Sequence, residues 1–186
     1  MADPAKRRAT YEDLLAVPDR LVAEILHGNL VTHPRPAARH ANAASNLGGL
    51  LFDPFRRGRG GPGGWIILVE PEVHLAEDVV VPDLAGWRRE RMPELPDVAA
   101  FELAPDWVCE VLSPSTVATD RVDKLPIYAR EGVQNVWLVD PLARTLEVLR
   151  LERGAYWLVG MWRDEAVVRA EPFDAIELEL AVLWAR

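Results

Sequence analysis

The stretch WVCEVLSPST, residues Trp107 to Thr116, decides how the fold of this chain is interpreted. Five of its first six residues are apolar or carry a thiol, which is typical of a strand that is buried on both faces. Glu110 interrupts this pattern, although burying an unpaired charge costs several kcal/mol or more. Glu110 therefore needs a partner, either elsewhere in the chain or bound from solution.

The length and composition indicate one globular domain spanning residues 1–186. Apolar residues make up 49% of the chain and charged residues 27%, which predicts a packed core. No apolar run approaches the ~18 residues of a membrane span, and no apolar segment follows the basic N-terminal residues as in a signal peptide. The one cysteine, Cys109, cannot form an internal disulfide, so we expect a reducing cytoplasm and no membrane partner.

The net charge of −8 argues against a protein that coats nucleic acid with a broad basic surface. It does not exclude an enzyme acting on nucleic acid, because a local basic patch or a bound metal ion can supply positive charge. The cluster Arg56–Arg59 and the group Arg88, Arg89 and Arg91 are candidates for such a patch. Solvated loop charge is the simpler interpretation of each.

Helical and strand patterns alternate along the chain. Helices are expected over Thr10–Ala16, Ala37–Phe55 and Asp120–Glu131. Strands are expected in a hairpin around His27–Asn29 and over Trp65–Val73, Val79–Trp87, Trp107–Leu112, Asn135–Asp140, Thr145–Leu151 and Ala155–Trp162. Glu77 and Asp78 should form a turn, and Arg88–Pro105 a long loop bordering a site. This order predicts an α/β or α+β fold around one central mixed sheet flanked by helices.

Three carboxylates lie where exposure to solvent does not explain them. Glu24 in LVAEIL, Asp83 in VVVPDLAGW and Glu110 each interrupt an apolar, strand-like run. A single buried carboxylate can pair with an arginine or accept backbone hydrogen bonds, but three in one small domain favour a shared partner. Mg²⁺ or Mn²⁺ takes such oxygen ligands, and one or two carboxylates with a backbone carbonyl and water are enough to bind it.

A zinc site is not favoured. The four histidines, His27, His33, His40 and His74, show no paired spacing. Cys109 is adjacent to Glu110, so strand alternation directs it to the opposite face, where we expect it to pack in the core.

A positive group is available on the helix that follows Glu110. Asp120, Lys124 and Tyr128 are spaced four apart and therefore share one stripe of that helix. Asp120 and Lys124 could form a surface ion pair worth about 0.5 kcal/mol. Alternatively, a helix returning from the SPST turn could bring the Lys124 ammonium back to the strand that carries Glu110.

Together these residues resemble the PD-(D/E)xK nuclease superfamily. The order is Pro82-Asp83 after a strand, the segment EVLSPST, a helix bearing Lys124 and Tyr128, and GVQNVWLVDP. Within the superfamily the chain is similar to the Uma-type family of restriction-endonuclease-like proteins, over about Tyr11 to Tyr156. The resemblance implies a restriction-endonuclease-like core and Mg²⁺-dependent hydrolysis of phosphodiester bonds in DNA.

The resemblance also implies roles for individual residues. Asp83 and Glu110 would be the acidic metal ligands, together with the backbone carbonyl of Val111. Glu24 matches the acidic residue before the first hairpin turn and could hold a second metal ion through water. The superfamily places its lysine two residues after the second acid, where this chain has Leu112, so Lys124 would take over. Apart from the resemblance, His40, Asp120 and Tyr128 are candidates for side chains that position these residues without binding the metal ion, although a histidine on a helix, such as His40, more often packs or caps.

Three functions stay open at this point: a metal-dependent endonuclease, a catalytically inactive binding or scaffold module with the same fold, and another hydrolase with paired carboxylates, such as a glycosidase. Trp65, Trp87 and Trp107 could line the cleft of the last, or pack in the core. A homodimer is plausible because a double-strand cut takes two active sites. A terminal apolar segment could cover the chain's own core or an interface: Leu178, Leu180, Val182, Leu183 and Trp184.

Overall fold

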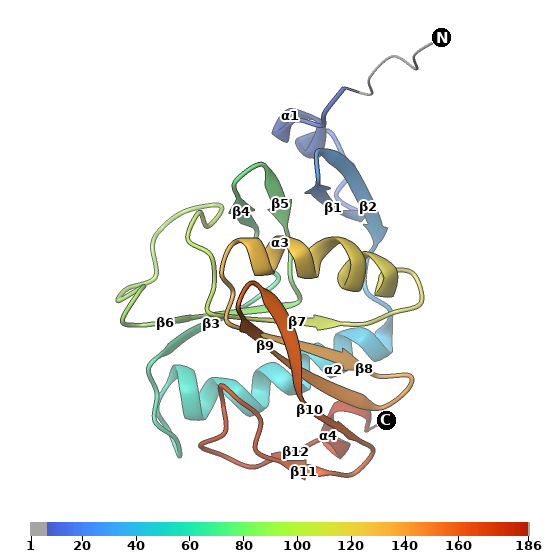
Figure 1. Cartoon of the computed structure of the whole chain (residues 1–186). Helices are drawn as coiled ribbons and strands as arrows, with labels where there is room; N and C mark the ends of the chain where they lie inside the picture. Colours follow the sequence, from blue (N-terminus) through green and yellow to red (C-terminus); the bar gives the residue numbers. More distant parts are fainter. Residues whose placement is uncertain (1–6, 186) are drawn as a thin grey trace.

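The computed structural model describes residues 7–185 (Figure 1). Its helices are α1 (Tyr11–Leu15), α2 (Ala38–Leu51), α3 (Leu125–Arg130) and α4 (Ala181–Trp184), with π-helical segments η1 (Phe52–Arg56) and η2 (Thr119–Lys124). Its strands are β1 (Leu21–Leu26), β2 (Asn29–Pro34), β3 (Trp65–Val69), β4 (Val73–Leu75), β5 (Asp78–Val80), β6 (Leu84–Arg88), β7 (Trp107–Val111), β8 (Asn135–Asp140), β9 (Thr145–Glu152), β10 (Ala155–Arg163), β11 (Val167–Val168) and β12 (Leu178–Glu179).

The central sheet has six strands in the order β10-β9-β8-β7-β6-β3. Strands β7 and β8 are parallel and the other neighbours are antiparallel, which confirms the expected mixed sheet. Helix α2 covers one face and α3 the other (Figure 1). Cys109 packs in the cluster on the α2 face, as predicted, whereas Val108 packs on the α3 face. Strand alternation therefore directs Glu110 toward α3.

A second sheet holds the N-terminal hairpin, in the order β2-β1-β5-β4. The hairpin turn consists of His27 and Gly28, both with positive φ, so the expected hairpin is confirmed. Leu26 and Val80 of this sheet share a hydrophobic cluster with Val108 of the central sheet. Shared packing of this kind fixes β1, and with it Glu24, against the central sheet.

Two predicted strands are wrong as continuous elements. The stretch Trp65–Val73 divides at Pro71 into β3 and the start of β4, and Val79–Trp87 divides at Pro82 into β5 and β6. Proline cannot donate a backbone hydrogen bond to a ladder, so each strand ends and the chain crosses to the other sheet. The predicted turn also moves by one residue, because Asp78 is buried at the start of β5.

The helix after β7 contains a π-helical segment at the point where its proline lies. Pro126 has no N–H group, and just before it Leu125 donates to the Asp120 carbonyl five residues back. Helix α3 then continues regularly to Arg130. Pro54 similarly lies within η1, at the end of α2. The expected helices are thus present, with π-helical turns that a regular 3.6-residue pattern does not predict.

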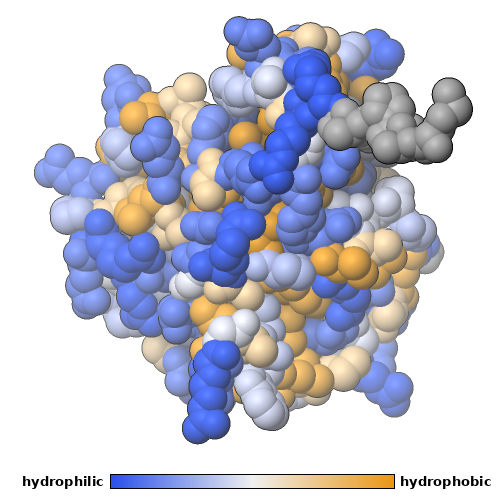
Figure 2. Space-filling model, turned by 45° about the horizontal axis from the view of Figure 1, so that its top comes forward, coloured by the Kyte–Doolittle hydropathy of each residue, from blue (hydrophilic) through white to orange (hydrophobic). Residues whose placement is uncertain are grey.

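The C-terminal segment covers the chain's own core. Leu178, Leu180 and Leu183 are buried on the α2 face, with Trp184 packed partly against them. Phe173 is fully buried there against Trp65 and Trp107. The surface seen in Figure 2 is hydrophilic over most of its area, with apolar side chains in small groups. Among residues 7–185, no helix has the length and apolar character needed to cross a bilayer.

Candidate active site

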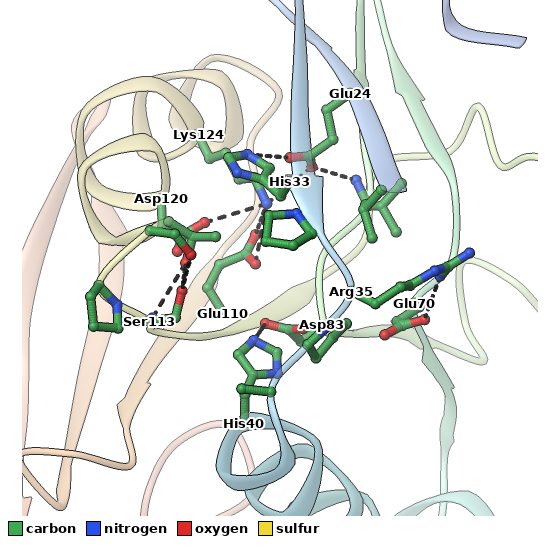
Figure 3. A pocket seen from close by; sticks show the side chains of 18 residues that line it. Glu24, His33, Arg35, His40, Glu70, Asp83, Glu110, Ser113, Asp120 and Lys124 are labelled. Atoms are coloured by element: carbon green, nitrogen blue, oxygen red, sulfur yellow. Dashed lines mark hydrogen bonds and ion pairs between the residues drawn. The ribbon is translucent and has the colours of Figure 1, made fainter. Parts of the chain in front are cut away.

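A pocket of about 280 Å³ opens where the two sheets meet. One wall is the connection between β2 and α2, and the opposite wall is the Ser113–Thr116 turn after β7. Glu24, Asp83, Glu110 and Lys124, the four predicted catalytic side chains, all line it, as does Asp120 (Figure 3). Residues predicted from four separate segments therefore lie around one cavity.

The Lys124 ammonium lies at the centre of three carboxylates. Its Nζ is 3.0 Å from Glu24 Oε1, 3.3 Å from Glu110 Oε1 and 3.4 Å from Asp120 Oδ1, and all four side chains are almost fully buried. Burial alone lowers the pKa of Lys124, but the surrounding carboxylates outweigh it and raise this pKa well above its usual value. Lys124 is therefore a buried, permanently charged group and not half of a surface ion pair.

Glu110 is held from two sides. The Tyr128 hydroxyl donates to Glu110 Oε1 at 2.5 Å, and Lys124 donates to both carboxylate oxygens. Burial raises the pKa of Glu110 well above its usual range although Lys124 lowers it, and the negative charges of Asp120 and Asp83 add to the increase. Burial likewise raises the pKa of Asp120. The site thus holds three carboxyl groups around one ammonium, and burial favours the protonated form of two of them.

Asp83 lies in the short link between β5 and β6, directly after Pro82. Its Oδ2 accepts the backbone N–H of Val111 at 2.7 Å and lies 3.3 Å from His40 Nε2. Burial lowers the pKa of His40, but the hydrogen bond with Asp83 and the charge of this carboxylate raise it overall. His40 of α2 therefore contacts Asp83, and the hydrogen bond from the Val111 amide holds Asp83 at the end of β7.

Glu24 is fixed by the backbone of the neighbouring strand. Its Oε1 accepts the N–H of Val81 at 2.8 Å, and its Oε2 lies 3.8 Å from His33 Nε2. That nitrogen of His33 is buried without a hydrogen-bond partner in the described part of the chain. The sequence pattern did not identify His33, because its spacing to other histidines carries no signal. In the hairpin register His33 pairs with Val22 and Glu24 pairs with Val31, so the two residues are diagonal neighbours across β1 and β2.

The structure explains how a helix can carry the lysine. Leu112 follows β7 and is buried on the α3 face together with Ile127 and Tyr128. The Lys124 side chain approaches the same face of β7 from η2, one helical turn before Ile127 and Tyr128. The position two residues after Glu110 thus has a packing role, and the amine comes from the helix that Leu112 packs against.

The oxygen-rich side chains of the pocket fit a hard divalent cation that takes only one or two ligands from the protein. No three His, Cys, Asp or Glu side chains in the described range 7–185 are grouped so that they alone could hold a metal ion. Mg²⁺, however, usually takes only one or two carboxylates together with water and substrate phosphate. Asp83 and Glu110 line one pocket, and such an ion would replace the proton that burial favours on Glu110.

Other predicted features lie elsewhere. Neither Arg56–Arg59 nor the loop Arg88–Pro105 lines this pocket, so the loop does not border the site as expected. The exposed cationic side chain that lines the pocket is that of Arg35, on the β2–α2 connection, and no sequence motif indicated it. Trp65, Trp87 and Trp107 are all buried in the core and form no aromatic cleft.

Comparison with known proteins gives two findings. The family model described as "Uma2: Putative restriction endonuclease" matches residues 8–182. A crystal structure of a "putative nuclease belonging to DUF820" from Anabaena variabilis is similar, with a TM-score of 0.76 and 22% sequence identity, and the match covers 95% of this chain and 97% of that chain. No curated protein matches this chain. At 22% identity the structural likeness concerns the fold.

Proposed function

Because this chain belongs to the Uma2 family of restriction-endonuclease-like proteins, we propose that it is a Mg²⁺-dependent endonuclease that hydrolyses phosphodiester bonds in DNA. Its family and fold are nuclease-like. The proposal adds three points to this: the metal ion, DNA as the substrate, and the roles of individual residues.

One observation carries the proposal: a buried ammonium is surrounded by three carboxylates, and the carboxylate of Asp83 lines the same pocket. Hydrolysis of a phosphodiester requires an activated water and positive charge near a phosphate that becomes more negative in the transition state. A site with Asp83 and Glu110 as metal ligands and Lys124 as a fixed cation supplies the groups for both requirements. A structural ion pair would need only one carboxylate.

The roles follow from the contacts. Bound Mg²⁺ would lower the pKa of a coordinated water and screen the phosphate charge. Asp83 and Glu110 would hold this ion, with the Val111 carbonyl as a third oxygen donor, while His40 and Tyr128 keep the two carboxylates in place. Lys124 would donate a hydrogen bond to the attacking water or to a phosphate oxygen. Glu24 and Asp120 orient the Lys124 ammonium, and Glu24 could bind a second ion through water.

Two alternatives make different predictions. A glycosidase would need a sugar-binding cleft, and the three strand tryptophans that could have formed one are buried in the core. A catalytically inactive scaffold with the same fold would keep the buried ion pairs but bind no metal ion. Metal binding and cleavage therefore distinguish the second alternative from the proposal.

The decisive experiment is nicking of supercoiled plasmid with Mg²⁺, Mn²⁺ or EDTA, together with Mn²⁺ calorimetry. The wild type should cleave only with a divalent ion. Asp83→Asn and Glu110→Gln should lose both metal binding and cleavage, whereas Lys124→Met should bind the ion and lose cleavage. Glu152→Gln, at an exposed carboxylate of β9, is the control and should behave as wild type. A folded wild type that neither binds Mn²⁺ nor cleaves would support the inactive scaffold.

The proposal includes a homodimer in the reducing cytoplasm. Cutting both strands of a duplex takes two active sites, and the single, buried Cys109 suits a compartment without disulfides. Sedimentation velocity with and without DNA tests the dimer, and a monomer in both conditions would restrict each molecule to one strand per binding event.

A further inference from the structure

A second groove, of about 360 Å³, lies beside the active-site pocket. It is formed by the first turn of α2, the turn between β8 and β9, and the C-terminal residues of α4. Arg39 on α2 and Arg144 in the β8–β9 turn both line this groove. Neither arginine belongs to the basic clusters that the sequence suggested.

The topology puts this groove and the pocket at the same edge of the central sheet. Strands β7 and β8 are parallel neighbours, so their carboxyl ends lie side by side. The Ser113–Thr116 turn follows β7 and forms one wall of the pocket, while Pro141–Arg144 follow β8 and form a wall of the groove. Arg39 and His40 are consecutive on α2, with His40 lining the pocket and Arg39 the groove. In Figure 1 the start of α2, the end of β8 and the C-terminus lie on one side of the molecule.

The charge of the groove is opposite to that of the pocket. Five carboxylates and two cationic side chains line the pocket, whereas the groove is lined by two arginines and no carboxylate. Both arginines are exposed, and among the described residues neither side chain has a hydrogen-bond or ion-pair partner. The nearby Asp140 carboxylate accepts the N–H groups of Leu142 and Ala143 in the turn. Most other arginines of this acidic protein are paired, for example Arg121 with Glu147 and Arg150 with Glu171.

We propose that this groove binds the DNA backbone next to the scissile phosphate, with Arg39 and Arg144 each contacting one phosphate. The inference rests on the proposed nuclease function. An acidic pocket repels the polyanion that it must cleave, and its bound metal ion compensates only at the reacting phosphate. Two free arginines at the adjoining edge attract the flanking strand and direct it across His40 and Asp83. Guanidinium groups suit this role because they bind phosphate oxygens in a bidentate geometry.

The test is equilibrium binding of a fluorescein-labelled duplex of about 20 base pairs, and of the single strand of equal length, at several salt concentrations. Ca²⁺ replaces Mg²⁺ during binding, and gels confirm that the probe stays intact. Arg39→Gln and Arg144→Gln should each weaken binding several-fold. Each should reduce the slope of log K against log salt by about 0.9 on duplex or about 0.7 on single strand. The matched control is Arg153→Gln. Like Arg144, Arg153 is exposed at positive φ in a hairpin turn, but it lies at the other end of β9, roughly 26 Å away at about 3.3 Å per residue.

In cleavage assays, the two groove variants should raise KM and leave kcat within about twofold of wild type, because neither residue touches the reacting atoms. Unchanged circular dichroism and melting temperature would show that they are folded. If the wild type binds DNA and both groove variants bind with its affinity and salt slope, the groove inference is overturned and the proposed function stands. If the wild type binds neither probe at any salt concentration, the proposed function itself is overturned, and the inference with it.

Discussion

At the scale of single residues, Lys124 is the group on which the site depends. Its ammonium is 95% buried and within 3.4 Å of three carboxylates. Lys124→Met leaves these carboxylates without a counter-charge, so we expect the free energy of unfolding to fall by about 3 to 5 kcal/mol. Arg121→Met on the same helical segment is the control, because its partner Glu147 is nearer the surface, and its loss should cost at most about 1 kcal/mol. Equal losses in urea unfolding would contradict this account of Lys124.

Tyr128 tests whether Glu110 is positioned by a hydrogen bond. Tyr128→Phe removes the donor to a buried carboxylate and keeps the ring, so we expect a loss of about 2 kcal/mol in stability and a weaker affinity for Mn²⁺. Tyr156→Phe is the matched control: its hydroxyl donates to the neutral Val133 carbonyl, and its loss should cost about 1 kcal/mol without changing Mn²⁺ affinity. A similar Mn²⁺ affinity in the two variants would exclude the positioning role.

The raised pKa of Glu110 makes metal binding depend on pH. Burial lets Glu110 keep its proton to a higher pH than an ordinary carboxyl group, so in the metal-free protein its stabilising contribution is lost as pH rises through this raised pKa. A metal ion needs the ionised form. Binding of Mn²⁺ should therefore release protons, and the apparent affinity should increase with pH. Calorimetry in buffers of different ionisation enthalpy measures this release, and the control variant Glu152→Gln should release as many protons as the wild type.

At the scale of elements, the sequence predicts which residues form the site better than it predicts how the strands divide. Buried carboxylates are visible in a sequence because they interrupt apolar runs, and Glu24, Asp83 and Glu110 were found in this way. The sequence did not predict two sheets, because β3 with β4, and β5 with β6, each form one apolar run in the sequence. Only the structure shows that Pro71 and Pro82 end the hydrogen-bonded ladders and divide these runs between the sheets. The partners of Lys124 depend on this arrangement, since Glu24 reaches the lysine only from the second sheet.

Asp78 connects that second sheet to the helix of Lys124. It is fully buried, accepts the His27 N–H at 2.6 Å and pairs with Arg130 of α3 at 2.8 Å. Asp78→Ala leaves the His27 amide without its partner, so we expect a loss of about 2 to 3 kcal/mol and faster hydrogen exchange in β1 and β2. The adjacent exposed residue gives the control: Glu77→Ala should cost less than about 1 kcal/mol and leave exchange in the hairpin unchanged. Unchanged exchange in Asp78→Ala would show that the hairpin is fixed by its apolar contacts alone.

At the scale of the whole molecule, the two faces of the central sheet have different roles. The Glu110 carboxylate of the site points to one face, and the aromatic packing around Phe173, which stabilises the fold, lies on the other. The Glu110 side chain points to the α3 face, although His40 of α2 also lines the pocket, whereas Phe173 of the C-terminal segment packs on the α2 face against Trp65, Trp107 and Trp137. Phe173→Ala should leave a cavity among three strands and cost about 3 to 5 kcal/mol. Ile176→Val, in the same segment and only partly buried, should cost at most about 1 kcal/mol.

The division between the faces predicts a specific outcome for Phe173→Ala. At a temperature where the variant is still folded, it should bind Mn²⁺ with the wild-type affinity, because Asp83 and Glu110 keep their supports from Val111, His40 and Tyr128. Thermal unfolding followed by near-ultraviolet circular dichroism gives the stability, and calorimetry on the folded protein gives the affinity. Loss of Mn²⁺ binding in folded Phe173→Ala would mean that the site needs the packing of both faces of the sheet, since Trp107 beside Phe173 lies on the same strand as Glu110.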